Sequence, residues 1–516
     1  MAAAAHSGDR YDAIVVGAGP GGLTAGLFLA LEGAKTLVLD MKDRPGGTSR
    51  GFKREGFTFP AGPLGFTGIA DVTGAFAGIE HLSKTDFRRA EYVVDAFGKR
   101  VKVSRELKRL TEDLATLFPD EAAGVRDFFG YVDTVSRRLS KTPMGEAPPI
   151  EPRFTRPAAD VVSALVNDAG IRRLLGSIGT CEPYGGFPLL AAMWDVMCER
   201  GIWYPDGGFD NMTASLAAAV TSSGGTLRTR AGVSRINVSG GKVSGVSLSD
   251  GDLIESPVVV SNADFKSTFL RLVDADSQPP EWRGAVEKAP MAHSIFQVAL
   301  GIDDRKADLS AFSDGSHIIH RRGEAPGNEP GPVWKEPEIE PEALAGQELE
   351  VCLWSRDDPG LAPQGRSVLV IRTAADHEHF SRYRPTPGTR LPGYSAYKEL
   401  LAGALVREVS RSLVRGLQEA IQVVDIATPL TFEEAGGRFA GSVVGWSQKQ
   451  KDADDYAVRS LVLTPIEGLY MAGFQAFSWL YLGGVPTAVL SGVEAARSAV
   501  AGKGPASRVM IPGADR

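Results

Sequence analysis

The sequence predicts an α/β fold in which a mainly parallel sheet domain is interleaved with an α+β domain. Two observations predict it. Residues 13–39 have the pattern of a β-α-β unit, and strand-like and helix-like stretches then alternate along the rest of the chain. A length of 516 residues provides about two to three domain-sized cores. We therefore expect separate chain segments to contribute strands to one sheet.

The β-α-β unit justifies the parallel sheet. Ala13–Val16 is a short apolar strand, Gly22–Glu32 has helical spacing, and Thr36–Leu39 is a second apolar strand. Gly33 stands where helices often end in a left-handed glycine. Because strands joined through a helix lie parallel, this unit predicts the core of the sheet.

Further elements follow at long intervals. We expect strands at residues 226–230, 233–238, 242–248, 258–260 and 469–472, and helices at residues 106–118, 125–139, 397–417 and 487–500. The uncharged segment Gly468–Val493 has the length of a membrane span. Its glycines and Pro486 favour instead a strand, a loop and a buried helix in series.

Composition excludes some classes of function. A net charge of −7 leaves no basic excess for neutralising phosphates, so nucleic acid is not expected as a partner. Three cysteines without a C-x-x-C pair fit a reducing compartment. The N-terminus lacks the basic and apolar regions of a signal peptide, so we expect a cytoplasmic protein.

A glycine motif carries the strongest chemical signal. Gly17, Gly19 and Gly22 form G-x-G-x-x-G directly after the first strand and at the start of the helix. Such glycines permit a tight turn, close approach of a pyrophosphate and close helix–strand packing, and the helix N-terminus attracts the phosphates. Asp40 ends the second strand, where a carboxylate binds the adenosine ribose. The motif predicts a dinucleotide site.

A second glycine loop, Arg44-Pro45-Gly46-Gly47-Thr48-Ser49-Arg50, favours FAD over NAD. With it, residues 11–63 resemble the opening of the phytoene desaturase, carotenoid isomerase and retinol saturase group, within the amine-oxidase-like flavoproteins. Further stretches resemble the same group in the same order: residues 204–209, 233–251, 259–264, 428–432, 441–446 and 468–492. The resemblance covers nearly the whole chain.

The resemblance implies a fold class and a domain division. The fold is an α/β FAD-binding domain, Rossmann-like and of glutathione-reductase type, with an interleaved α+β substrate domain. We expect residues 1–75, 200–270 and 455–505 in the FAD-binding domain, residues 76–199 and 271–454 in the substrate domain, and residues 506–516 as a tail.

The resemblance also implies contacts with a non-covalent FAD. Gly46, Gly47 and Thr48 would surround the pyrophosphate and ribitol, with Arg44 or Arg50 as a charge partner. Gly62 would lie near the flavin ring, Val233 would meet the adenine through its backbone, and Gly473 would approach the ribitol. Val485 and Pro486 would begin a helix directed at the flavin, where the positive helix end stabilises reduced flavin.

Some positions depart from the group. Thr48 stands where amine oxidases favour Arg, and Pro60 stands where the group often has Asp. An aromatic run follows Gly473, consisting of Phe474, Phe477, Trp479 and Tyr481. It is either a wall of the substrate channel or ordinary core packing, and the sequence favours neither.

The resemblance predicts an FAD-dependent oxidoreductase that desaturates, saturates or isomerises carbon–carbon bonds of an apolar, isoprenoid- or carotenoid-like substrate. A flavin amine oxidase and a lipid-binding carrier on the same fold are the alternatives. The catalytic residues are unknown, and Glu433, Glu434 and Tyr481 are only candidates.

We expect no metal site. His377 and His379 are interpreted as part of a solvated loop, and His317 and His320 likewise lack a third ligand. We expect an apolar small-molecule substrate and weak peripheral contact with membranes through residues 64–203. A second dinucleotide fingerprint is missing, so the electron acceptor is expected to be other than NAD(P).

Overall fold

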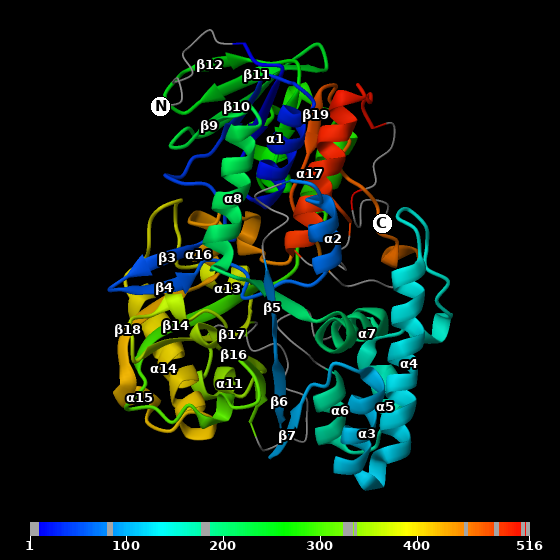
Figure 1. Cartoon of the computed structure of the whole chain (residues 1–516), viewed down its shortest axis with the longest axis vertical. Helices are drawn as coiled ribbons and strands as arrows, with labels where there is room; N and C mark the ends of the chain where they lie inside the picture. Colours follow the sequence, from blue (N-terminus) through cyan, green and yellow to red (C-terminus); the bar gives the residue numbers. More distant parts are fainter. Residues whose placement is uncertain are drawn as a thin grey trace.

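The computed structural model describes residues 10–79, 86–96, 98–176, 186–322, 334, 338–447, 453–478, 484–506 and 511. These residues form three neighbouring parts (Figure 1). A parallel sheet with helices packed on it lies at one end of the molecule. A larger mixed sheet with its own helices and a group of α-helices lie side by side at the other.

The parallel sheet has the strand order β19-β13-β1-β2-β9, and every neighbouring pair is parallel. Its strands are fully buried apolar segments except at the β9 edge, as expected for a sheet covered on both faces. Their bounds are β1 Ala13–Val16, β2 Thr36–Leu39, β9 Thr226–Arg228, β13 Val259–Ser261 and β19 Leu469–Met471. The predicted β-α-β unit and the contribution of distant segments are confirmed.

Helices α1 (Pro20–Leu31), α8 (Gly208–Ser222) and α17 (Gly484–Val500) pack against this sheet (Figure 1). Gly33 has φ +84, which confirms the left-handed end of α1. The charge-free stretch from Gly468 resolves into β19 and the start of α17, with residues 479–483 outside the described part. Across the described residues, we find no helix that combines the length and the apolar character needed to span a bilayer.

An antiparallel sheet of β10 (Val233–Ser239), β11 (Lys242–Leu248) and β12 (Leu253–Glu255) lies at the outer end of this part (Figure 1). Gly240 and Gly241 join β10 to β11 with φ of +60 and +77. Two successive positive φ values are typical of the tight turns that suit the twist of a hairpin.

The mixed sheet has seven strands in the order β18-β14-β17-β16-β15-β6-β7. One face packs on α14 (Tyr394–Ser412) through an apolar cluster that includes Phe296, Leu369 and Leu405. The other face turns toward the parallel-sheet part, where Ala299 and Val370 join its core. The strands are β6 Tyr92–Ala96, β7 Lys99–Lys102, β14 Ser294–Asp303, β15 His317–Arg321, β16 Leu349–Leu353, β17 Arg366–Ala375 and β18 Ile421–Ala427.

A helical part has a core of its own around Phe128, Phe187 and Trp194. Its main helices are α3 Leu107–Leu117, α4 Ala122–Lys141, α5 Ala158–Leu165, α6 Ala169–Gly176 and α7 Phe187–Asp195.

Shorter elements are spread over the molecule. They are α2 Ile69–Ala75, α9 Phe265–Ser267, α10 Pro280–Lys288, α11 Pro341–Ala345, α12 Trp354–Asp357, α13 His377–Ser381, α15 Leu417–Ala420, α16 Pro429–Glu434, β3 Gly51–Arg54, β4 Phe57–Pro60, β5 Phe87–Ala90 and β8 Ile202–Pro205.

Several predicted ends differ from the structure by a few residues, and two of the differences have a clear backbone cause. The predicted helix at residues 397–417 stops at Ser412, and Gly416 with φ +81 separates it from the short α15. The predicted strand at residues 226–230 stops at Arg228, because Arg230 turns the chain with φ +53.

Candidate functional site

The glycine turn lies at the carboxyl end of β1, directly before α1. Gly17 has φ +96, and Gly19 is the N-cap of α1 without a capping side chain. The first turn of α1 carries no acidic residue. Free backbone N–H groups and the positive end of the helix dipole therefore remain available for an anion.

The two glycine loops lie against each other. Gly46 N donates to the Ala18 carbonyl at 2.7 Å. A Cβ atom added to Gly47 would stand 3.2 Å from Gly19 Cα, and one added to Gly22 would stand 1.9 Å from the Gly17 carbonyl oxygen. A side chain at Gly22 would therefore collide with the backbone, whereas the face of Gly19 is open apart from Gly47 and the Asn262 side chain.

Asp40 braces this turn from the end of β2. It is buried, its Oδ2 accepts a hydrogen bond from Ala18 N at 2.8 Å, and its Oδ1 accepts one from Lys42 N at 2.8 Å. Each carboxylate oxygen keeps a second lone pair. The acid thus orients the backbone of the turn and stays able to accept the predicted ribose hydroxyl.

Asn262 was missed as a site residue by the sequence reasoning. It follows β13, donates from its backbone N to the Val16 carbonyl at 2.8 Å, and directs Nδ2 at the Gly17 carbonyl at 3.4 Å. A Cβ atom on Gly473, the predicted ribitol residue with φ +102, would stand 3.0 Å from Asn262 Oδ1. A polar residue directly after a buried parallel strand was the available signal.

The two predicted charge partners are engaged elsewhere. Arg44 donates to the Gly51 carbonyl at 3.0 Å and lies 3.7 Å from Asp210, and Arg50 pairs with Asp43 at 3.2 Å. Thr48 instead accepts a hydrogen bond from Arg438 Nη2.

Arg438 stacks on Phe474, with its guanidinium carbon 4.1 Å from the ring centroid. Burial lowers the pKa of Arg438 to about 10, partly offset by the charge of Asp264. The side chain therefore stays cationic at neutral pH.

A buried polar row on the mixed sheet holds the segment around Gly62. Arg372 on β17 donates to the Gly62 carbonyl and, through Nε, to Gln297 Oε1 at 2.7 Å. Gln297 Nε2 donates to the Pro60 carbonyl at 3.1 Å. Burial lowers the pKa of Arg372, and the charge of Glu350, its partner in register, opposes that shift. Both polar residues interrupt apolar strands, which was a signal in the sequence.

The remaining predicted cofactor residues lie at element ends. Val233 begins β10, and Val485 and Pro486 lie in the first turn of α17, so the predicted helix start is confirmed. A Cβ atom on Gly492 of α17 would stand 2.4 Å from the Gly21 carbonyl oxygen, which shows how closely α17 approaches α1. Whether these residues contact a cofactor stays a prediction.

The predicted aromatic wall is only partly described. Phe477 is 1% exposed and packs in the core of the parallel-sheet part. Phe474 lies under Arg438. Trp479 and Tyr481 lie outside the described residues.

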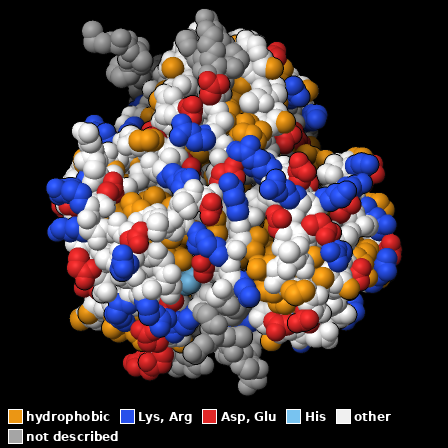
Figure 2. Space-filling view, turned by 60° about the horizontal axis from the view of Figure 1, so that its bottom comes forward, with side chains coloured by type: hydrophobic (Ala, Val, Ile, Leu, Met, Phe, Trp, Pro, Cys, Tyr) orange, Lys and Arg blue, Asp and Glu red, His pale blue; other side chains and the backbone are white. Residues whose placement is uncertain are grey.

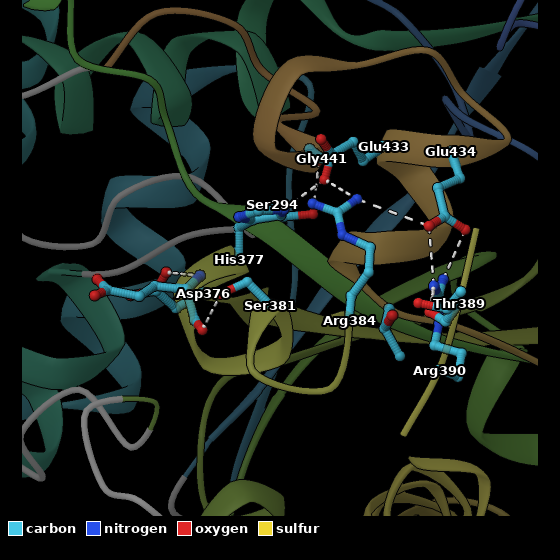
Figure 3. A network of polar contacts seen from close by, with 12 residues as sticks. Ser294, Asp376, His377, Ser381, Arg384, Thr389, Arg390, Glu433, Glu434 and Gly441 are labelled. Carbon is cyan, nitrogen blue, oxygen red and sulfur yellow. Dashed lines mark hydrogen bonds and ion pairs between the residues drawn. The ribbon is translucent and has the colours of Figure 1, made fainter. Parts of the chain in front are cut away.

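Glu433 and Glu434 are the last two residues of α16, and their carboxylates belong to a cluster of ion pairs (Figure 3). Glu433 contacts His377 at 2.6 Å, Arg384 at 2.7 Å and Arg271 at 3.4 Å, and Arg390 binds both oxygens of Glu434 at 2.9 and 2.7 Å. Hydrogen bonds from His377 and Arg384 outweigh burial and lower the pKa of Glu433 to about 2. A carboxylate so firmly ionised is poorly suited to donate a proton.

The interpretation of His377 and His379 as a solvated loop is wrong. Both lie in α13, where His377 binds Glu433 and His379 is buried against Tyr397 and Trp334. His317 is also buried, stacked 4.5 Å from Tyr92, and burial lowers its pKa to about 3. In the part of the chain that the structure describes, no three His, Cys, Asp or Glu side chains are grouped for a metal ion.

The profile of the flavin containing amine oxidoreductase family matches residues 20–500, from the glycine turn to the end of α17. The chain belongs to this family. The recognised resemblance and the fold class are thereby confirmed, and the protein is a flavin-dependent oxidoreductase.

Curated relatives match along most of their length. A chloroplastic prolycopene isomerase of Daucus carota is 27% identical over 96% of this chain and 81% of its own. A lycopene-forming phytoene desaturase of Pseudescherichia vulneris is 26% identical over 70% of this chain and 76% of its own. An all-trans-retinol 13,14-reductase of Danio rerio is 24% identical over 90% and 82%.

Solved structures support the fold. Cyclohexylamine oxidase from Brevibacterium oxydans superposes with a TM-score of 0.62 over 95% of this chain and 99% of its own, at 15% identity. At that identity the likeness concerns the fold alone.

Proposed function

We propose that this enzyme uses FAD to desaturate, saturate or isomerise carbon–carbon bonds of an apolar, isoprenoid- or carotenoid-like substrate. The supporting observation is the similarity of 96% of the chain to a prolycopene isomerase, together with a glycine turn that keeps its open face. The relatives named above act on isoprenoid compounds by isomerisation, desaturation or reduction, according to their names.

The residues fit a bound FAD. Two glycine loops leave room at an uncapped helix N-terminus, and Asp40 and Asn262 fix the backbone around them. Bound flavin would supply hydride exchange with a substrate carbon, for which the protein provides orientation and exclusion of water. The cysteines among the described residues, Cys198 and Cys352, are buried in the helical part and on β16 of the mixed sheet, which supports non-covalent binding.

The first experiment tests the cofactor. Purified protein should show flavin absorbance, and acid precipitation should release the flavin into the supernatant. Colourless protein would support the lipid-carrier alternative, and colour that stays in the pellet would contradict non-covalent binding.

The variant Gly19→Val tests the phosphate site. Its first added carbon would stand 3.0 Å from Asn262 Nδ2, at the end of a side chain that is able to shift, so the fold should survive. We expect folded protein with little or no flavin, measured by circular dichroism and absorbance. Full flavin content would refute the proposed site.

The substrate class is tested by anaerobic incubation with carotenoid and retinoid precursors, followed by chromatography of extracted products. Conversion at a carbon–carbon bond supports the proposal. Turnover of amines with release of peroxide, and no change in any polyene, would favour the amine oxidase alternative.

We also propose that the electron acceptor is not NAD(P) and that the enzyme contacts membranes weakly. The membrane proposal is supported by the apolar substrate, because extraction at a bilayer surface avoids moving apolar area through water. Figure 2 shows one face on which Lys and Arg are intermixed with Asp and Glu, with apolar groups between them. NADH or NADPH should leave the oxidised flavin band unchanged under anaerobic conditions. Sedimentation with liposomes tests the membrane contact, and no binding at any lipid composition would contradict it.

A further inference from the structure

Arg438 is held on a rigid loop beside the second glycine loop. The segment begins with α16, capped by reciprocal hydrogen bonds of Thr428 and Thr431. It ends at Gly441, whose carbonyl accepts a hydrogen bond from Ser294 Oγ at 2.7 Å. Between these two anchors, Arg438 N donates to the Phe432 carbonyl at 3.3 Å. The backbone position of Arg438 is therefore fixed from both sides.

The guanidinium has one end engaged and one end free. Nη2 donates to Thr48 Oγ1, and the Phe474 ring covers the guanidinium plane. Nη1 is buried and has no hydrogen-bond partner among the described residues. Leaving a buried donor of a cation without a partner costs free energy, so such an atom is expected to meet a ligand.

The charges around Arg438 do not provide that ligand. Asp264 acts on it electrostatically, and its Oδ1 caps α9 through Ser267 N at 3.0 Å. Its Oδ2 is buried and has no hydrogen-bond partner among the described residues, but no ion pair within 4.0 Å joins it to Arg438 there. Lys42, between β2 and the second glycine loop, is a second cation near Arg438 and donates to the Ala435 carbonyl. Its pKa is lowered by burial and by the charges of Arg50 and Arg438, and raised by that of Asp40.

The neighbouring backbone is already arranged for an anion. Thr48 follows Gly47, and Gly47 lies against Gly19 at the uncapped N-terminus of α1. A phosphate group there would be neutralised by the helix end and by a guanidinium fork, the geometry that binds phosphate best. Arg44 and Arg50 differ from Arg438 in having carboxylate partners, since Arg44 binds the Gly51 carbonyl beside Asp210 and Arg50 pairs with Asp43.

We infer that Arg438, from the segment after α16, is the cation that binds the phosphate groups of the dinucleotide, in place of Arg44 or Arg50. This inference rests on the proposed binding of FAD. It makes the mixed-sheet part a contributor to the phosphate site, because α16 and its loop follow β18 of that sheet. Thr48 then positions the guanidinium through its hydroxyl.

The experiment compares three probes on the flavin-free protein: FAD, ADP and riboflavin. Arg438→Met keeps most of the volume and removes the charge. We expect Kd for FAD and for ADP to rise about 10- to 100-fold, with riboflavin affinity unchanged, because riboflavin has no phosphate. Arg438→Lys should recover part of the loss. Measurement is by flavin fluorescence quenching and calorimetry.

Arg271→Met is the matched control. The guanidinium carbon of Arg271 lies 5.5 Å from the ring centroid of Phe439, the residue that follows Arg438 in the chain. Unlike Arg438, Arg271 is bound to Glu433, and its side chain is half exposed. Its variant should bind all three probes as the wild type does. The melting temperature of each flavin-free variant verifies folding.

The outcomes separate the two proposals. If the wild type binds no FAD, the proposed function fails before Arg438 is tested. If the wild type binds FAD and Arg438→Met binds it equally well, the inference is overturned. An equal loss for riboflavin and FAD would also overturn it, because the arginine would then contact the ring or only support the fold.

Discussion

Two groups of charged side chains lie along the segment that begins with α16, and they differ in whether the protein itself provides all of their partners. On one side, Glu433 and Glu434 form a cluster with Arg384, Arg390 and His377 (Figure 3). Arg271 also contacts Glu433, so each carboxylate is bound by at least two arginines. On the other side, Arg438 keeps a buried Nη1 with no partner among the described residues. The first group is complete within the protein, and the second is not.

This difference indicates which group is structural. A buried carboxylate with several cationic partners is stabilised in the ionised form and fixes the chain around it. A buried cation with a free donor is costly in the absence of a ligand and becomes favourable when an anion arrives. We therefore interpret the Glu433 cluster as a structural link between α13 and α16, and the Arg438 group as the one that binds phosphate.

The largest expected effect concerns stability. Glu433→Ala removes the shared partner of His377, Arg384 and Arg271, and the charge of Arg384 then remains partly buried. We expect the free energy of unfolding to fall by about 3 kcal/mol, as when one partner of a buried ion pair is removed. Urea denaturation measures this loss. FAD affinity of the folded fraction should stay within about twofold, and a large loss of affinity would erase the distinction between the groups.

The pH dependence of stability gives the second effect. The folded pKa of Glu433, about 2, lies below its ordinary value of 4.5, so its contribution is present above pH 4.5 and disappears as the pH falls toward 2. The free energies of unfolding of the wild type and Glu433→Gln should differ at pH 6. This difference should shrink by on the order of 1–2 kcal/mol, after allowance for solvent screening, as the pH falls to 3. A constant difference across this range would show that Glu433 is not held ionised.

Arg438→Met should affect stability differently: in the flavin-free protein it should leave the free energy of unfolding unchanged or raise it, whereas Glu433→Ala lowers it. Removing a cation whose buried Nη1 lacks a partner relieves a desolvation cost, although its contact with Thr48 is lost. We expect the flavin-free variant to be as stable as the wild type or more stable, by up to about 1 kcal/mol. Thermal unfolding of both flavin-free proteins tests this. A loss above about 2 kcal/mol would place Arg438 with the structural group.

The smallest effect is expected for Arg50→Gln. Its ion pair with Asp43 is exposed on the carboxylate side, and such pairs contribute about 0–1 kcal/mol. Stability and FAD affinity should both change by less than about threefold in their equilibrium constants. If Arg50→Gln lost more FAD affinity than Arg438→Met, Arg50 and not Arg438 would be the cation that binds the phosphate.

Local patterns were sufficient to predict the core of the fold. Ala13–Val16, the glycine turn and Thr36–Leu39 are adjacent in sequence, so period, turn chemistry and strand length agree within one unit. The helix start at Val485 and Pro486 was predicted for the same reason, since Pro486 suits a first helical turn, and α17 begins one residue earlier at Gly484.

The parts of the site that come together through tertiary packing could not be predicted. Asn262 and Arg438 meet the glycine loops, and Arg372 meets the Gly62 carbonyl, only because distant strands and loops converge there. Nothing in the residues next to Arg438 indicates Thr48 as its partner. His377 and His379 were misread because a short helix of five residues, buried by packing, has the local composition of a loop.

The strand order has a consequence for the synthesis of the protein. β13 lies between β1 and β19, yet β19 is made long after β13. Until then β13 is an edge strand with unpaired backbone groups, and at about 5–20 residues per second this interval is on the order of tens of seconds. Gly473 and α17 complete the surroundings of the glycine turn only at the end. Flavin is therefore expected to enter a finished chain, and the free flavin concentration at that moment determines how much holoenzyme forms.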